Sequence, residues 1–253
     1  MERDYQYNYS EIRPSVFDTE GRNRKANTIV RVCQDFLGTE SLSDLTLLDV
    51  GSSSGIIDNY LADFFGEVHG IDIDEPAMKF ARERFDKPNL HFAVGDAMKL
   101  AQNDNSVDVV VCSHVYEHVP DAAQMFSEIC RVLKPGGFCY FSGNNRVMLM
   151  EPHYRLPFLS LLPRPLAHLY MRMAGKGRYY HEKHLSYRDL KTLMADFELE
   201  DYSARIIESP TEYAVEYMLK PGSMKWRLAR LVARHAKWAT PHIWLLRKPG
   251  SEA

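Results

Sequence analysis

The stretch Leu47-Leu48-Asp49-Val50-Gly51-Ser52-Ser53-Ser54-Gly55 decides the fold, because an apolar strand runs here directly into a loop of small residues. An apolar pattern at helical spacing begins just after the loop, at Ile56. A loop without bulky side chains lets a ligand approach the backbone, and the exposed amides of the next helix face that ligand. A tight strand-to-helix turn also favours glycine and serine for structural reasons alone, so the loop by itself leaves both interpretations open.

Outward from this stretch, strand and helix patterns alternate with short connections. Strands are expected at 46–50, 67–72, 89–94, 106–112, 138–142, near 200–208 and at 242–246, and helices at 22–37, 55–65, 75–85, 121–133 and 186–197. Apolar strands that alternate with helices imply a parallel sheet covered on both faces. The sequence therefore predicts an α/β fold with a doubly wound, mostly parallel seven-stranded sheet and helices on both faces.

The chain is long enough, at 253 residues, to bury a full core, and we interpret 1–253 as a single domain. Residues 1–43 are expected to form an irregular amino-terminal cap followed by a helix, and 44–143 the core that binds a cofactor. The proline-punctuated, aromatic segment 144–184 is expected to insert after the fifth strand as a lid over an acceptor. Residues 185–253 then supply a helix, strands and a basic amphipathic segment that precedes the last strand.

The composition points to a cytoplasmic protein. Hydrophobic residues make up 45% of the chain and charged residues 26%, which is ordinary for a globular protein. The amino terminus lacks the apolar core of a signal peptide, and prolines interrupt the apolar stretch 156–171, so it is not a membrane span. The four cysteines lack metal-ligand spacing and fall in apolar patterns, which favours core thiols in a reducing compartment.

Three carboxylates fall at the carboxyl ends of three successive strands. Asp49 lies just before the end of the first, Asp72 at the end of the second, and Asp96 just past the third. In doubly wound sheets these ends line one crevice where the strand order reverses, so the three acids are expected to converge on one ligand.

The spacing indicates a nucleoside without phosphates. Asp72 follows Gly51 by 21 residues, close to the ~20-residue offset at which an acid binds ribose hydroxyls. Asp96 and the Ala97 amide can pair with an adenine edge. Gly51-x-Ser53-x-Gly55 lacks the third glycine of the dinucleotide fingerprint, and Asp49 suits an ammonium better than a pyrophosphate. An adenosine that carries an ammonium and no phosphates is S-adenosylmethionine.

Five ordered signals resemble the class I methyltransferases that use S-adenosylmethionine, of the type that acts on small molecules. These signals are Asp49–Gly55, Ile71-Asp72-Ile73, Val94-Gly95-Asp96-Ala97, Glu117–Asp121 and Leu133–Gly137. By that resemblance Gly51, Ser53 and Gly55 cradle the methionine part with Asp49 on its amino group, Asp72 and Ile73 bind the ribose, Gly95, Asp96 and Ala97 the adenine, and Ser113 and His114 flank the sulfonium. The family usually has glycine where this chain has Ser53, and a serine fits that place readily only at negative φ.

The acceptor side offers two candidates for a general base, His118 just beyond the fourth strand and His153 in the lid. An oxygen acceptor must lose its proton during methylation, and histidine titrates near neutral pH. A structural role in the loop remains open for His118. His114, Glu117 and His118 stand at i, i+3 and i+4, where quinone-biosynthesis O-methyltransferases carry a comparable acidic cluster, but we expect no metal here.

Two basic segments stand out against a net charge of −3. Residues 217–251 carry eight Lys or Arg and no acid, and residues 146–183 carry seven Lys or Arg against two acids. Within the first segment, 224–238 read as a helix with one apolar and one basic side. Such a helix packs on its own domain in most proteins, but it can also dock on an anionic membrane, together with the apolar stretch 156–171. A small or lipid-linked acceptor is expected, and nucleic acid is not, because no base-flipping signature follows the fourth strand.

The sequence therefore predicts an enzyme that transfers a methyl group from S-adenosylmethionine, leaving S-adenosylhomocysteine, most simply to an oxygen of a small polar or anionic acceptor. A glycan or lipid-linked acceptor at a membrane surface is the alternative within the same class. A nicotinamide-dependent oxidoreductase and a non-catalytic cofactor-binding module are the alternatives outside it. The acceptor and the oligomeric state are left open.

Overall fold

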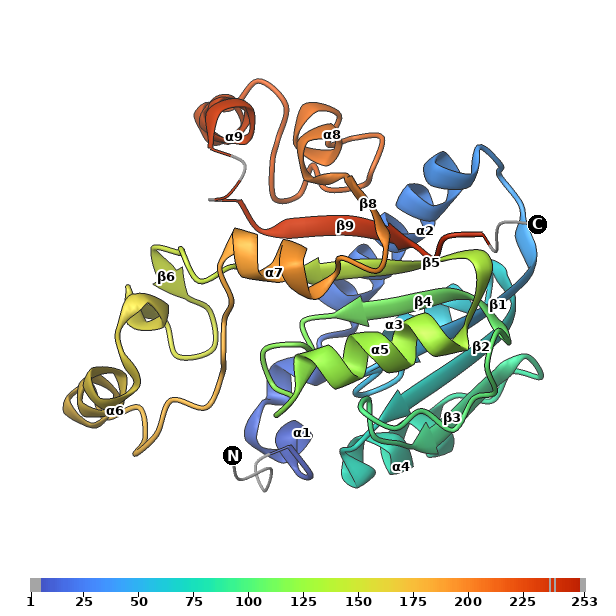
Figure 1. Ribbon diagram of the computed structural model, residues 1–253, viewed down its shortest axis with the longest axis horizontal. Helices are drawn as coiled ribbons and strands as arrows, with labels where there is room; N and C mark the ends of the chain where they lie inside the picture. The colour runs from blue at the N-terminus through green and yellow to red at the C-terminus, as the bar shows by residue number, and fades with distance from the viewer. Residues whose placement is uncertain (1–5, 237, 239, 251–253) are drawn as a thin grey trace.

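The computed structural model describes residues 6–236, 238 and 240–250 (Figure 1). A seven-stranded sheet forms its centre, in the spatial order β3 (Leu90–Val94), β2 (Phe65–Asp72), β1 (Leu42–Val50), β4 (Val107–Ser113), β5 (Leu133–Gly143), β9 (His242–Arg247) and β8 (Glu198–Asp201). Strands β1 to β5 pair in parallel, whereas β9 runs antiparallel to both of its neighbours. The expected α/β fold with a mostly parallel sheet is confirmed.

Helices cover both faces of the sheet. On one face lie α2 (Thr19–Leu37), α3 (Ile56–Leu61) and α8 (Ser203–Glu208), and on the other lie α5 (Ala122–Val132) and α7 (Tyr187–Leu193). Figure 1 shows α5 and α7 in front of the sheet, with α2 behind it. Side chains of β4 alternate between the two cores, Val109 and Val111 in one and Val110 and Cys112 in the other, because successive strand residues point to opposite faces.

The strand order reverses between β1 and β4. From β1 the chain passes outward to β2 and β3, with α3 and α4 (Glu75–Arg84) as crossovers, and then returns to place β4 on the other side of β1. The carboxyl ends of β1 and β4 therefore diverge into loops on opposite sides, and ligands bind in doubly wound sheets at this switch point.

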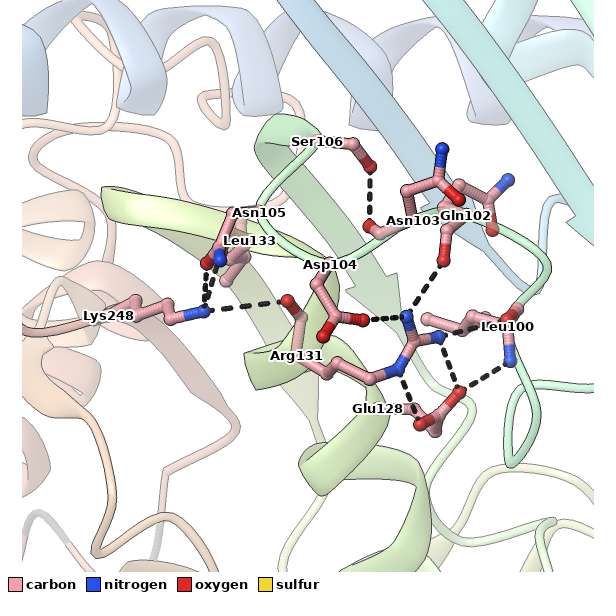
Figure 2. A network of polar contacts seen from close by, with 10 residues as sticks. All are labelled: Leu100, Gln102, Asn103, Asp104, Asn105, Ser106, Glu128, Arg131, Leu133 and Lys248. Atoms are coloured by element: carbon pink, nitrogen blue, oxygen red, sulfur yellow. Dashed lines mark hydrogen bonds and ion pairs between the residues drawn. The ribbon is translucent and has the colours of Figure 1, made fainter.

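A polar network fixes the long connection from β3 to β4 (Figure 2). The Arg131 guanidinium, near the end of α5, donates to both oxygens of Glu128, to Asp104 Oδ1 and to the carbonyls of Leu100 and Gln102, at 2.7–2.9 Å. Lys248, just after β9, donates to Asn105 Oδ1 and to the Leu133 carbonyl, both at 2.7 Å. The network holds the connection, which begins at the Gly95–Ala97 loop, against α5.

The segment 144–184 folds as a unit with a small apolar core of its own. It contains a short hairpin of β6 (Met150–Glu151) and β7 (Leu156–Pro157), the 3₁₀ turn η2 (Leu159–Leu161) and helix α6 (Arg164–Met173). Leu156, Leu159, Ala167, Met171 and Tyr180 form its core. In Figure 1 this segment stands out from one end of the sheet. We refer to residues 144–184 as the lid.

Two local expectations were wrong. The strand expected near 200–208 is the short β8, which ends at Asp201, followed by the helix α8; the Asp201 carboxylate accepts a hydrogen bond of 3.0 Å from the Ser203 amide, which favours a helix start there. The cap expected to be irregular contains α1 (Tyr9–Ile12) and the 3₁₀ turn η1 (Pro14–Phe17). The Asp74 carboxylate anchors α1, because it accepts hydrogen bonds from the amide and hydroxyl of Ser10.

The basic segment forms α9 (Met224–His235), but the apolar side of this helix is not packed on the sheet. Met224, Leu228 and Leu231 are 80%, 60% and 56% exposed. The helix is held instead through Trp226, whose indole N–H donates to the Ile207 carbonyl at 2.8 Å. Lys237, the last basic residue of the expected helix, lies outside the described residues.

Cys33, Cys112 and Cys139 are buried free thiols and Cys130 is half-buried, as expected for core cysteines. Among the described residues, no helix combines the length and the apolar character that crossing a membrane requires.

Candidate functional site

A cavity of about 420 Å³ opens at the carboxyl ends of the central strands, where the strand order reverses. Eleven of the thirteen residues predicted for the site line it: Asp49, Gly51, Ser53, Asp72, Ile73, Gly95, Ala97, Ser113, His114, His118 and His153. Gly55 and Asp96 do not line it. The pattern of strand ends thus locates the cavity from the sequence alone.

Gly51 is required by the backbone of the loop after β1. Its φ of 88° lies in the left-handed region, and a Cβ placed there would come within 2.4 Å of Val115 Cγ2. Its amide donates to the Ile71 carbonyl at 2.8 Å, which fastens the loop to the end of β2. The loop can therefore come this close to Val115 only with glycine at position 51.

Ser53 also adopts a left-handed backbone, with φ 55°, so the negative φ at which a serine would fit this place readily is not found. A non-glycine residue in this region carries strain of roughly 1–2 kcal/mol. The Ser53 amide donates to Asp72 Oδ2 at 2.8 Å, and the Asp74 amide donates to Asp72 Oδ1 at 2.9 Å. The Asp72 carboxylate is therefore held in place by both loops.

Gly55 and Asp96 have local structural roles. Gly55 caps the start of α3 with φ 71°, and a Cβ there would lie 2.7 Å from Ala81 Cβ, so this glycine allows α3 and α4 to pack closely. Asp96 accepts a hydrogen bond from the Met98 amide at 3.0 Å, which shapes the loop after β3. The contact expected between Asp96 and an adenine stays a prediction.

Buried Asp49, partly buried Asp72 and Arg22 set the charge at the cofactor end. Burial raises the pKa of Asp49 to about 7, with nearby Asp72 adding to the rise and Arg22 opposing it. Burial also raises the pKa of Asp72, against the hydrogen bonds from the Asp74 and Ser53 amides. These carboxylates lie in a cavity that favours a cationic ligand, because such a ligand would stabilise their charged forms.

The amino-terminal segment also lines the cavity. No periodic pattern in the sequence predicted this position. Gln6, Tyr9, Arg13, Arg22 and Lys25 all line it. The Gln6 side-chain amide donates to the His118 carbonyl, and Arg13 Nη1 donates to the His153 carbonyl at 2.6 Å. The same segment therefore contacts both the loop after β4 and the lid, which the tyrosines and arginines of residues 5–25 could have suggested.

The two candidate bases lie together on the acceptor side. The rings of His118 and His153 are perpendicular, with centroids 5.0 Å apart, and Tyr9 meets the other edge of His118 at 5.4 Å. His153 Nδ1 lies 2.6 Å from Glu151 Oε1. The lid thus brings His153 next to His118, which directly follows Glu117 in the loop after β4.

Burial lowers the pKa of His118 although Glu117 and Glu182 oppose it. For His153 burial acts in the same direction, but the hydrogen bond to Glu151 and the charge of Glu182 outweigh it and raise the pKa. Buried Glu117 is held at a pKa of about 2, because the contact with His114 at 3.5 Å and the neighbouring His118 and His184 outweigh burial. His118 is therefore the imidazole of this pair that gives up its proton more readily.

Sequence spacing puts His114, Glu117 and His118 on one helical face, but only two of them belong to one possible metal-ligand group in the structure. Glu117 and His118 form a group with His153 rather than with His114, with the ligand atoms of the three residues within 4.8 Å of one another. A second group of this kind comprises Glu151, His153 and His184. The lid thus supplies His153 to the first group and all three residues of the second, and sequence spacing could not connect these residues with the strand ends.

Comparison with known proteins places the chain in a family. The family model described as a methyltransferase domain matches residues 48–141. The ubiquinone biosynthesis O-methyltransferase of Albidiferax ferrireducens is 30% identical over 176 residues, which cover 65% of this chain and 68% of the relative. That of Hydrogenovibrio crunogenus is 28% identical over 192 residues, covering 74% of this chain and 75% of the relative.

The fold is also similar to that of a solved structure. A chain of the complex between the Haloferax volcanii Trm112 methyltransferase activator and a methyltransferase superposes with a TM-score of 0.56 at 21% identity, covering 93% of this chain and 96% of that one. The chain belongs to the class I S-adenosylmethionine-dependent methyltransferases. It is an enzyme whose cofactor is S-adenosylmethionine, and the oxidoreductase alternative is thereby wrong.

The described residues fit this cofactor. Buried Asp49 and partly buried Asp72 face the cavity beside a loop of small residues, and a bulkier residue at position 51 would collide with Val115. A cationic, phosphate-free nucleoside supplies the positive charge and the hydroxyl donors that such acids accept.

Proposed function

We propose that the enzyme methylates an oxygen of a small polar or anionic acceptor. Asp49 would hold the cofactor's ammonium beside the Gly51 and Ser53 loop, Asp72 and Ile73 its ribose, and Gly95 to Ala97 its adenine. Ser113 and His114 would flank the sulfonium. The bound cofactor supplies a methyl group that already carries its own leaving group, so the chain has to align the acceptor and exclude water.

His118 would accept the acceptor's proton. It lines the same cavity as Ser113 and His114 and lies just beyond β4, next to the expected position of the methyl group. The rings of Tyr9 and His153 both pack against the His118 ring, which restricts its movement. Relatives named ubiquinone biosynthesis O-methyltransferases support oxygen as the accepting atom.

The observation that carries the proposal is the pair of acids, buried Asp49 and partly buried Asp72, at adjacent strand ends in one cavity. Calorimetric titration with S-adenosylhomocysteine tests it. Asp72→Ala should weaken binding by roughly 1.5–3 kcal/mol, which is about 10- to 150-fold, because charged hydrogen bonds are lost. Asp63→Ala removes an exposed carboxylate paired with Lys87 and should leave the affinity unchanged. Equal affinity of Asp72→Ala and wild type would contradict the ribose assignment.

A panel of hydroxylated acceptors, neutral and anionic, identifies the substrate class when release of S-adenosylhomocysteine is measured. With the best acceptor, His118→Gln should lower kcat by about 100-fold or more, as expected when a general base is lost. His91→Gln makes the same change at an exposed histidine paired with Glu67 and serves as the control. If His118→Gln retains wild-type kcat, the imidazole only supports the loop.

A lipid-linked acceptor at an anionic membrane is the second candidate, favoured by exposed apolar side chains in two basic segments, the lid and α9. In the lid, Leu149 and Met173 are 76% and 79% exposed, and Phe158 is exposed as well. The apolar side of α9 is exposed in the same way, and the helix also carries Lys225 and Arg227. Figure 1 places α6 and α9 at the same end of the long axis. Apolar residues flanked by basic ones suit the interface of an anionic bilayer.

Sedimentation with vesicles separates the two candidates. Binding to vesicles that contain phosphatidylglycerol, but not to pure phosphatidylcholine, is expected at low salt for a membrane-docking enzyme. The double variant Lys225→Gln with Arg227→Gln should bind less, whereas Arg31→Gln with Arg84→Gln makes the same charge change on other helices and should not. Absence of wild-type binding at low salt removes the membrane candidate.

A further inference from the structure

A carboxylate and two imidazoles lie together beneath the lid. Glu151 Oε1 is 2.6 Å from His153 Nδ1 and 3.5 Å from His184 Nε2. The three ligand atoms, one from each residue, all lie within 4.8 Å of one another. The side chains of Glu151 and His184 are 0% and 1% exposed, and that of His153 is 13% exposed. One ion could therefore be shared by all three after small side-chain movements.

His184 shows that the group is incomplete. Neither of its ring nitrogens makes a hydrogen bond, although the side chain is buried. A buried polar group without a partner is costly, and native proteins rarely leave one unexplained. Its Nε2 lies 3.5 Å from Glu151 Oε1 without making a hydrogen bond, so an ion bound between them would give this nitrogen the polar contact that it does not make now.

Glu151 is already oriented to act as a ligand. Its Oε2 accepts a hydrogen bond of 2.8 Å from the Tyr154 amide, which leaves Oε1 directed at both imidazoles. A second buried acid, Glu182, accepts from the Tyr154 hydroxyl at 3.3 Å through Oε1, while its Oε2 makes no hydrogen bond. Buried carboxylates around the two imidazoles favour a cation, and the outer contacts fix the ligand as they do in metal sites.

The donor set selects the class of ion. One carboxylate and two neutral imidazoles suit Zn²⁺ and similar divalent transition metals, whereas Mg²⁺ and Ca²⁺ prefer oxygen ligands alone. In a tetrahedral zinc site, ligand atoms lie ~3.3 Å apart. The contact of 3.5 Å between Glu151 and His184 fits, and the 2.6 Å contact with His153 has to open by less than ~1 Å.

We propose that Glu151, His153 and His184 bind one divalent transition-metal ion of the Zn²⁺ class. Three protein ligands leave a fourth position for water or an acceptor oxygen, and His153 also lines the cavity. Only this last role rests on the proposed function: an acceptor hydroxyl at the fourth position would become more acidic and lose its proton more readily to His118. Binding of the ion itself does not depend on that role.

The group of Glu117, His118 and His153 is the competing site. Its ligand atoms also lie within 4.8 Å of one another. The Glu117 oxygens also make no hydrogen bond, but Glu117 lies 3.5 Å from His114, an imidazole outside its group, whereas Glu151 Oε1 lies 2.6 and 3.5 Å from the two imidazoles of its own group. The observations therefore favour the group within the lid.

Metal binding is tested on protein that is purified without a histidine tag, treated with EDTA and then titrated with Zn²⁺ against a chromophoric chelator. Wild type should bind one Zn²⁺ per chain, and Co²⁺ in its place should give the visible absorption of a nitrogen- and oxygen-ligated tetrahedral site. Glu151→Gln and His184→Gln should each weaken Zn²⁺ binding by at least 100-fold. His91→Gln removes an exposed histidine near the start of β3 and should bind as wild type.

The results that overturn the proposal are distinct from failure of the methyltransferase assignment. Lack of stoichiometric Zn²⁺ binding by wild type refutes the site, as does wild-type affinity in Glu151→Gln and His184→Gln. Loss of binding in Glu117→Gln with retention in His184→Gln moves the ion to the competing group and refutes this one. Titration of the same samples with S-adenosylhomocysteine reports on the cofactor site separately. The wild-type measurement decides even if one variant does not fold.

Discussion

The network around Arg131 and the buried cluster of the lid are both made of charged side chains, yet they differ in how many of their polar atoms find partners. In Figure 2 the guanidinium of Arg131 donates to two carboxylates and two carbonyls, near the surface. In the lid, Glu182 and His184 are buried with polar atoms that make no hydrogen bond. A network that only fastens segments is satisfied within the chain, whereas a buried group that lacks a partner indicates a ligand or stored strain.

His242 tests how far this comparison extends. Both of its ring nitrogens lack a hydrogen bond, but its neighbours are aromatic: the ring stacks on Trp244 with centroids 4.5 Å apart and meets Tyr187 at 5.3 Å. No ligand group of the kind found in the lid includes it within the described residues. We therefore interpret this buried imidazole as a source of acid sensitivity rather than a site.

The largest expected effect follows from that interpretation. Burial lowers the pKa of His242 to about 4, below the unfolded value near 6.5, although Asp201 opposes the change. Above pH 6.5 both states are neutral; as the pH falls towards 4, the unfolded state binds the proton first and the free energy of unfolding decreases by about 3 kcal/mol. Urea unfolding of wild type and His242→Phe between pH 7 and 4 should show a smaller acid loss in the variant. Parallel pH curves would refute the assignment.

Cofactor binding should also depend on pH, through Asp49. Because burial raises the pKa of Asp49 to about 7, an ammonium ligand has to displace a proton at lower pH. Affinity for S-adenosylhomocysteine should fall about tenfold per pH unit below 7, since one proton must be released. Calorimetry at pH 5.5, 6.5 and 7.5 measures this. Asp49→Asn should bind weakly with little pH dependence, and an unchanged slope in that variant would contradict the prediction.

The cofactor end and the buried cluster of the lid also differ in how well the sequence predicted them. The acids and glycine of the cofactor end lie at strand ends, where a period-two pattern fixes their position, so Asp49, Gly51 and Asp72 were found. Arg22 reaches the cavity from α2, and Glu151 meets His184 across 33 residues of lid, with no repeating pattern to connect them. Such contacts depend on tertiary packing and could not be inferred from spacing.

Mutations in the network around Arg131 should change the free energy of unfolding but not the affinity for the cofactor product. Arg131→Gln removes charge-assisted hydrogen bonds to Glu128 and Asp104, and should lower the free energy of unfolding by about 1–2 kcal/mol. Arg24→Gln breaks an exposed pair with Glu20 within α2 and should cost at most about 0.5 kcal/mol. Affinity for S-adenosylhomocysteine should stay at the wild-type value in both. A large loss of affinity in Arg131→Gln would show that the network shapes the site as well.

Ser53 has a strained backbone, yet its amide also holds the Asp72 carboxylate in place. Glycine at this position removes the strain of a left-handed backbone but makes the unfolded chain more flexible, so Ser53→Gly should change the free energy of unfolding by less than about 1 kcal/mol. Ser53→Ala keeps the strain, and should be about 1 kcal/mol less stable than Ser53→Gly. Denaturation of the two variants, compared directly, isolates the backbone contribution. Equal stability would mean that the loop relaxes to negative φ, and the amide would then no longer point at Asp72, which should appear as weaker binding of S-adenosylhomocysteine in Ser53→Ala.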